Sequence, residues 1–296
     1  NAWAGALFVR HTLPNAHLLA GGDDFDFLIS DGTALQYLKD STIAWNGRVS
    51  GRVLDILFDA ENGQFLILSQ GEISSIKPEG AELKGVFSGS GLTSFALREN
   101  GNDLVVGTND GYYVLDPTSM DEKGELQKAL PWTEITAVRE IGGKLWFGSA
   151  RGAFMLKDDG KFNYYASKRW LPSDQVIDVA QGPGNSVLIL TTKGLAQICF
   201  KEMTLHDKAE FFQQQVRSRH IRHGFNATLG YLTDGNVSTG SLEDSDNDGL
   251  WTAMYGAGEC FAARDRPYLR TTDTSTPRPA ILVFMPTTRK RPGATR

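Results

Sequence analysis

The sequence is poor in the residues that mark several common protein classes. Its 296 residues contain only two cysteines, Cys199 and Cys260, which excludes a disulfide-dense scaffold and a zinc site built from several cysteines. The longest uncharged apolar run, 280–285, is far shorter than the roughly 20 residues that a membrane-spanning helix needs, so we expect no membrane span. Basic charge is also scarce, because 30 Lys and Arg stand against 35 Asp and Glu. Phosphate binding needs a basic face, and we therefore expect no nucleic-acid partner.

Common catalytic signatures are missing as well. The sequence contains no glycine-rich phosphate loop, no Gly-x-Ser-x-Gly, no His-Glu-x-x-His and no Cys-x-x-Cys. The pattern of motifs therefore leaves open whether the protein is an enzyme.

Glycine, by contrast, is abundant, and its positions reveal a repeat. Five segments share one shape, in which an apolar strand is followed by Ser or Thr, a short turn, a glycine and a second strand. The turn glycines are 39, 40, 41 and 42 residues apart, at Gly32, Gly71, Gly111, Gly152 and Gly194. A period of about 40 residues with short, Val- and Ile-rich strands is typical of a β-propeller blade. We predict a mainly β protein with a propeller of five visible repeats over 1–203 and a small helical segment over 204–263. An irregular basic tail is predicted over 264–296.

One repeat carries a more specific pattern. The run Trp146-Phe147-Gly148-Ser149 followed by Gly152 resembles the blade signature of the two-component-regulator propeller repeat, and 106–111 resembles it nearly as well. The resemblance covers about residues 20–203. It implies a binding or sensing propeller, often extracytoplasmic, and no particular chemistry. Five blades close a ring or form part of a larger one, and the sequence leaves both open.

After residue 203 the pattern changes to that of helices. The segment 205–223 lacks turn residues and is followed by Gly224, which predicts a helix with a glycine C-cap. A polar loop is predicted over 226–243, and a second helix after it with four apolar residues on one face, Leu250, Met254, Ala257 and Phe261. The stretch RHIRHG to DSDNDGLWTAMY also resembles a module of uncharacterised secreted propeller proteins, for which no reaction is known.

The string Asp244-x-Asp246-x-Asp248-Gly249 is the strongest chemical signal. Alternating carboxylates followed by a glycine can surround a hard cation with oxygen atoms, which predicts a structural calcium site. The twelfth position of an EF-hand loop would be Tyr255 here, so Glu259 is the candidate for the remaining ligand. The alternative is a polar loop whose last Asp caps the second helix.

Three further groups of residues are candidates for binding. His220, Arg222 and His223 can bind an anionic ligand or a metal; alternatively they complement the dipole of the first helix, or meet the acidic string across a helical interface. Asp55 and Asp178 occupy the same slot in the first strand of their blades, where Ser94 and Ala137 stand in two others. First strands line the channel of a propeller, so these carboxylates either face a ligand there or are solvated channel residues.

Two tripeptides, Asn226-Ala-Thr and Asn236-Val-Ser, have the form of N-glycosylation acceptors and favour a secreted or extracellular protein. The leading hypothesis is an extracytoplasmic recognition propeller that binds a small-molecule, carbohydrate or protein ligand. One alternative is a carbohydrate-active hydrolase or lyase that uses Asp and His residues of the C-terminal segment. Another is a protein-interaction scaffold.

Overall fold

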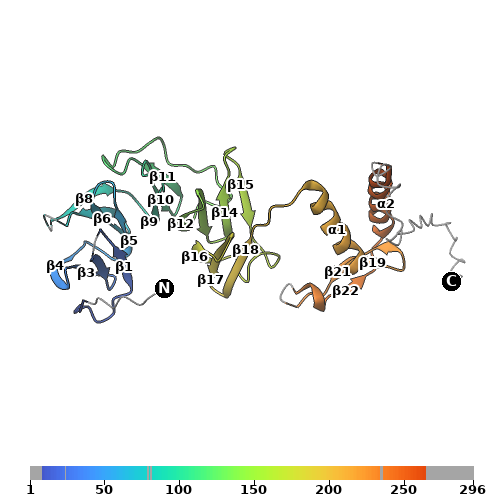
Figure 1. Cartoon of the computed structure of the whole chain (residues 1–296), viewed down its shortest axis with the longest axis horizontal. Helices are drawn as coiled ribbons and strands as arrows, with labels where there is room; N and C mark the ends of the chain where they lie inside the picture. Colours follow the sequence, from blue (N-terminus) through green and yellow to red (C-terminus); the bar gives the residue numbers. More distant parts are fainter. Residues whose placement is uncertain (1–8, 24, 79, 81, 234–235, 265–296) are drawn as a thin grey trace, which may run out of the picture. The chain divides into compact units, whose positions relative to one another are not determined.

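The computed structural model describes residues 9–264, except 24, 79, 81 and 234–235. It divides into two compact units, Asn1–Lys201 and Glu202–Arg296, and each is described here by itself (Figure 1). The predicted basic tail, apart from its first residue, lies outside the described residues.

The first unit consists of five antiparallel sheets that follow one another along the chain, which confirms the predicted β-propeller architecture (Figure 1). We number these sheets blades 1 to 5. Blade 1 contains β1 (Leu18–Gly21), β2 (Asp26–Ser30), β3 (Ala34–Lys39) and β4 (Thr42–Arg48). Blade 2 contains β5 (Val53–Asp59), β6 (Gln64–Ser69), β7 (Glu72–Ile76) and β8 (Leu83–Ser88). Blade 3 contains β9 (Leu92–Leu97), β10 (Leu104–Thr108) and β11 (Gly111–Leu115). Blade 4 contains β12 (Ile135–Ile141), β13 (Lys144–Ser149), β14 (Gly152–Leu156) and β15 (Phe162–Tyr165). Blade 5 contains β16 (Val176–Gln181), β17 (Ser186–Thr191) and β18 (Gly194–Cys199).

The repeated glycine lies in the turn between the second and third strands of each blade. At Gly152 the backbone has φ of +125°, and a Cβ there would lie 2.6 Å from the carbonyl oxygen of Tyr165, so only glycine fits. The residue before the turn is always Ser or Thr, and its hydroxyl donates to a backbone carbonyl across the turn. In blade 4 the Ser149 hydroxyl donates to Gly152 at 2.7 Å and accepts from the amide of Arg151 at 3.2 Å. The repeat motif is therefore a hydrogen-bonded turn in every blade.

The core of this unit lies between the blades, because each sheet packs one face on the next sheet. The side chain of Trp146 is 1% exposed between blades 4 and 5, where it packs among Val179, Val187 and Ile189. Burial of each such side chain stabilises the fold by about 1.5 to 3 kcal/mol. On the other face of blade 5, Leu190 and Leu195 are 42% and 59% exposed.

A β-bulge recurs near the start of the first strand in blades 2 to 5. In blade 2, Val53 pairs with Ser69 and Asp55 with Leu68, so Leu54 is the extra residue. The extra residue is Thr93 in blade 3, Thr136 in blade 4 and Ile177 in blade 5. A bulge bends the strand and redirects the side chains around it. It therefore fixes the direction of the residue that follows, which is Asp55, Ser94, Ala137 or Asp178.

The second unit contains two helices and two small hairpins. Helix α1 (Leu205–Arg219) begins at a capping box formed by Thr204 and Asp207, and none of its residues is buried. The helix ends at Arg219, so the prediction that it continues to a cap at Gly224 was wrong. Residues 221–226 instead form a hairpin of β19 (Ile221–Arg222) and β20 (Phe225–Asn226). Its two turn residues, His223 and Gly224, both have positive φ, the geometry that a tight two-residue hairpin requires.

The predicted polar loop is also partly ordered as strands. β21 (Thr228–Gly230) pairs with β22 (Ser241–Glu243), and a short 3-10 helix, η1 (Val237–Thr239), lies between them. Helix α2 (Asp248–Arg264) follows. Among the described residues, neither helix combines the length and the apolar character needed to cross a bilayer.

Candidate functional site

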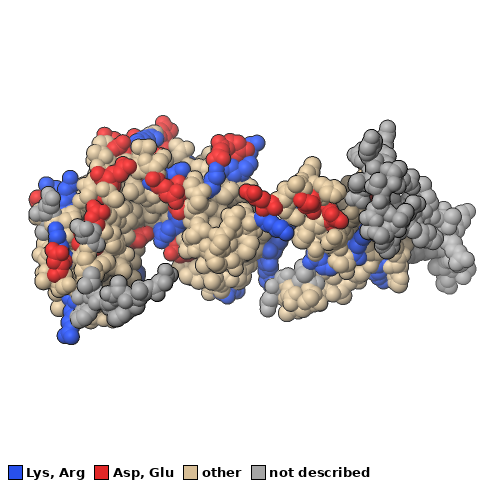
Figure 2. Space-filling view, in the orientation of Figure 1, with Lys and Arg blue, Asp and Glu red and all other residues tan. Residues whose placement is uncertain are grey.

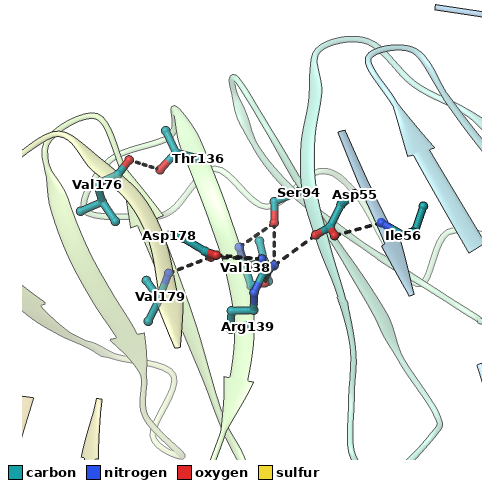
Figure 3. A network of polar contacts seen from close by, with 9 residues as sticks. All are labelled: Asp55, Ile56, Ser94, Thr136, Val138, Arg139, Val176, Asp178 and Val179. Atoms are coloured by element: carbon teal, nitrogen blue, oxygen red, sulfur yellow. Dashed lines mark hydrogen bonds and ion pairs between the residues drawn. The ribbon is translucent and has the colours of Figure 1, made fainter. Parts of the chain in front are cut away.

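Arg139 of blade 4 contacts three other blades of the propeller, blades 2, 3 and 5, through its one guanidinium group. It extends from β12 in blade 4, where Nη1 lies 3.3 Å from the Asp55 carboxylate and 3.3 Å from the Ser94 hydroxyl. Its Nη2 lies 3.1 Å from the carboxylate of Asp178. Figure 3 shows the guanidinium between Asp178 on one side and Asp55 and Ser94 on the other. The structure thus brings the two sequence-predicted carboxylates together on one cation, and we call these four residues the channel cluster.

The two carboxylates of the channel cluster are held in the same way. Each accepts a hydrogen bond from the amide of the residue that follows it, Ile56 at 2.9 Å and Val179 at 2.8 Å (Figure 3). Ser94 fixes the third side, because its hydroxyl also accepts from the amide of Val138 at 3.0 Å. The cluster is therefore oriented by backbone groups of blades 2, 4 and 5.

Burial is the main influence on Asp55. It raises the pKa of this carboxyl above its usual value, and the nearby charge of Asp178 acts in the same direction. The guanidinium of Arg139 and the amide of Ile56 lower the pKa and only partly offset the burial. Two carboxylates facing one guanidinium leave the ionised cluster with an excess of one negative charge.

A cavity of about 580 Å³ lies at the start of the first strands of blades 2 to 4, and its wall is formed by sequence neighbours of the channel cluster and not by the four cluster residues themselves. Its wall includes the extra residues of three bulges, Leu54, Thr93 and Thr136, each directly before a residue at the slot of Asp55. Polar groups complete the wall: the side chains of Gln70 and Asn109 come from the turns between second and third strands, and Glu134 from the connection into blade 4. Amide, hydroxyl and carboxylate groups in one cavity can exchange hydrogen bonds with a polar ligand.

The sequence signal for Arg139 was present but not recognised. Arg139 stands two residues after Ala137 in β12, so it lies on the same face as the slot that carries Asp55 and Asp178. A single cation at that position, facing carboxylates in two other blades, indicates an ion-paired cluster.

In the second unit, part of the predicted basic cluster meets the acidic string. Arg222 forms an ion pair with Asp244, and the two line a cavity of about 420 Å³ together with His223, Phe225 and Asp248. His220 takes no part in this cavity wall, and its Nδ1 lies 3.2 Å from the carbonyl oxygen of Ala227. The contact between the two motifs, one of the alternatives considered from the sequence, is therefore present in this unit.

The four predicted calcium ligands have separate partners. Asp244 pairs with Arg222, whereas Glu259 accepts from Gln213 at 2.7 Å and lies 3.4 Å from Arg217. Asp248 begins α2 and accepts from the amide of Ser245 at 3.2 Å, as the acidic member of a capping box does. Asp246 is exposed, and its Oδ1 accepts from the Ser245 hydroxyl at 3.4 Å. The part of the chain that the structure describes contains no group of three or more His, Cys, Asp or Glu side chains that could hold a metal, and the calcium site stays a prediction.

The two glycosylation candidates differ in exposure. Asn236 is exposed and caps η1, where it accepts from the amide of Ser238 at 3.0 Å. Asn226 is half-buried, and its side-chain amide donates to the carbonyl of Trp251 at 3.4 Å. Attachment of a glycan at Asn226 would therefore disturb a contact with α2.

Charge on the surface of the first unit is mixed in sign. Figure 2 shows acidic and basic side chains interspersed over the blades on this face. A mixed surface gives no long-range field of one sign.

Comparison with known proteins informs the fold. No family model matches the sequence, and no curated protein matches it. Among solved structures, two of the extracellular domain of BT4673 from B. thetaiotaomicron resemble the chain. One of these structures is named as part of a hybrid two component system, with a TM-score of 0.54, 10% identity and coverage of 64% of this chain and 28% of that one. The other is named as part of a one component system, with a TM-score of 0.55, 10% identity and coverage of 67% and 29%.

A chain of a structure titled "Crystal Structure of Mitotic Checkpoint Complex" is similar too, with a TM-score of 0.51, 8% identity and coverage of 63% and 62%. The present chain spans less than a third of the bacterial extracellular domain. Proteins with such different printed descriptions share the architecture, so the comparisons show the fold and leave the function to the residues of the site.

Proposed function

We propose that the protein is an extracytoplasmic recognition propeller that binds a small polyhydroxylated ligand, such as a carbohydrate, in the cavity beside the channel cluster. The observation that carries this proposal is the cavity wall, which combines amide, hydroxyl and carboxylate groups and includes the residues directly before Asp55 and Ser94 of the channel cluster. Arg139 ties that cluster together by bridging carboxylates of two other blades. An ion-paired, backbone-anchored cluster is preorganised, so little side-chain freedom is lost when a ligand binds next to it.

The lining groups support this ligand class. Gln70 and Asn109 each carry an amide that both donates and accepts, and Thr93 adds a hydroxyl group that has no partner among the described residues. The Thr136 hydroxyl already donates to the carbonyl of Val176 at 2.9 Å and can only accept from a ligand. Sugars present alternating donors and acceptors on a compact ring, which such groups can satisfy. The resemblance to extracellular sensor domains supports the extracytoplasmic role as an analogy of fold.

Calorimetric titration with a panel of neutral mono- and disaccharides tests the proposal. We expect at least one sugar to bind saturably to the wild type and at least tenfold more weakly to Asn109→Ala. Gln127→Ala is the matched control. Gln127 is a polar residue that pairs with Tyr112 at the edge of blade 3, the blade of Asn109, and it does not line the cavity. Absence of binding across the panel would favour the protein-interaction scaffold.

The enzyme alternative rests on the second unit, where Arg222, His223, Asp244 and Asp248 line one cavity. In that hypothesis the hydrolase or lyase chemistry belongs to His223 and Asp248. Hydrolysis of a panel of p-nitrophenyl glycosides would support it if turnover were lost in His223→Ala while the chain stayed folded. Arg222→Ala is measured in the same assay. It removes the ion pair with Asp244, and a loss of substrate affinity would support the predicted role of Arg222 in ligand binding.

A further inference from the structure

Asp26 is a buried carboxylate with one oxygen that has no partner. The residue is 5% exposed at the start of β2, and its Oδ2 accepts from the Tyr37 hydroxyl at 2.9 Å. Among the described residues, no donor lies within hydrogen-bond distance of Oδ1. A buried carboxylate oxygen without a partner costs about 1 to 3 kcal/mol of stability, or more when it is charged. Folding alone therefore gives no reason for this arrangement.

The backbone of Gly22 packs closely against this carboxylate. Gly22 crosses it, and a Cβ at Gly22 would lie 2.6 Å from Oδ1 and 2.8 Å from Oδ2 of Asp26. Glycine is therefore required at this position, and it keeps the carboxylate free of a side chain above it.

Asp26 also lines a cavity of about 440 Å³ that is separate from the one at the channel cluster. The two cavities lie at opposite ends of β6. Asn62 and Gly63, which precede this strand, line the cavity at Asp26, whereas Gln70, which follows it, lines the cavity near the channel cluster. The volume falls within the range of about 300 to 1,000 Å³ that is usual for small-molecule sites.

The chemistry of the lining specifies a ligand with two ends. A carboxylate can only accept, so a ligand that satisfies Asp26 must bring a donor, and a cation also compensates its charge. The half-buried rings of Phe25 and Phe58 in the same wall favour an organic ammonium ion. The described side chains provide no triad of metal-ligating residues here, which disfavours a metal ion. The exposed charges of the wall are mixed in sign. Lys39 and Lys77 would attract an anionic group, whereas Asp23 and Asp40 would attract a cation, as Asp26 does.

We propose that this cavity binds a small zwitterionic amine, whose ammonium group lies at Asp26 and whose anionic end lies at Lys39 and Lys77. The site differs from the proposed sugar site in position and in ligand, so either can fail without the other.

Three four-carbon probes test the proposal by chemical-shift titration of the ¹⁵N-labelled chain. They are 4-aminobutanoate with both charged ends, butylammonium with only the amine, and butanoate with only the acid. We expect saturable shifts at the amides of Gly22 and Phe25 with 4-aminobutanoate, affinity at least threefold weaker with butylammonium, and no saturation with butanoate. Asp26→Asn keeps an acceptor for Tyr37 and is expected to weaken 4-aminobutanoate at least tenfold. Asp158→Asn, at a carboxylate that is 90% exposed in blade 4, is the matched control.

A second variant keeps the test decisive if Asp26→Asn does not fold. Lys77→Gln changes an exposed side chain and is expected to remove the preference for 4-aminobutanoate over butylammonium. The proposal is overturned if butanoate binds as well as the amines, if Asp26→Asn binds 4-aminobutanoate as the wild type does, or if Lys77→Gln keeps the preference. Equal shifts with magnesium ions would overturn it in favour of a metal site.

Discussion

Asp55 and Asp178 occupy the same position of the bulge in two different blades and bind the same guanidinium, that of Arg139 (Figure 3). The repeat places two like charges in equivalent positions, and the cation from blade 4 compensates their repulsion. This ion-paired arrangement is expected to contribute to the stability of the propeller.

The coupling between Arg139 and Asp55 can be measured with a double-mutant cycle. We expect Arg139→Ala and Asp55→Ala to destabilise the propeller singly and to show a coupling free energy of about 1 kcal/mol, because both side chains are partly screened by solvent. Urea unfolding followed by tryptophan fluorescence provides the values. Arg151→Ala combined with Asp55→Ala is the control and should be additive, since Arg151 lies over Trp132 instead. Additivity in the Arg139 cycle as well would contradict a functional ion pair.

The raised pKa of Asp55 gives a pH dependence with a defined sign. Its folded state holds the proton more tightly than the unfolded chain does. The contribution to stability is therefore complete below the unfolded value of about 3.9 and is lost as the pH rises through the higher folded pKa. We expect Asp55→Asn to flatten the decrease in the free energy of unfolding over that range. Asp31→Asn should act in the opposite direction, since backbone amides of Ala34 and Thr33 lower the pKa of Asp31. Parallel wild-type and Asp55→Asn curves would argue against the burial of this carboxyl.

The turn glycine of blade 4 is expected to tolerate no side chain. Gly152→Ala forces a Cβ against the carbonyl of Tyr165 in addition to the positive φ, whereas Gly160→Ala has the positive φ with open space around it. A positive φ alone costs about 1 to 2 kcal/mol for a residue with a Cβ. Thermal unfolding should therefore show a larger decrease in Tm for Gly152→Ala than for Gly160→Ala. Equal decreases would mean that β15 moves away without cost.

Calcium is expected to have little effect on the second unit. Asp244 is paired with Arg222 and Glu259 with Gln213, so binding would require both contacts to break. We expect the Tm of the chelator-treated chain to be the same with and without millimolar calcium. By contrast, Asp248→Ala should lower the stability of this unit by about 1 kcal/mol through loss of the helix cap. Saturable calorimetric binding that disappears in Asp246→Ala would establish the calcium site.

The sequence determined the repeat. Turn glycines at nearly constant spacing, each preceded by Ser or Thr, are local features, since a positive φ and a hydroxyl bond across a turn need only a few neighbouring residues. The alignment of Asp55 with Asp178 followed from the same repeat. The first strands of blades 2 to 5, which are β5, β9, β12 and β16, recur with the same period for this reason.

Only the tertiary structure decided which partners these residues have. The length of α1 depended on the pairing of β19 with β20, which converts His223 and Gly224 from a helix end into a hairpin turn. Arg139 meets Asp55 and Asp178 because the first strands of blades 2, 4 and 5 lie near one another, and Gly22 packs against the carboxylate of Asp26. Such contacts join residues far apart in the chain. A repeat specifies the position of each residue within its blade, whereas the packing of blade on blade specifies which residues meet.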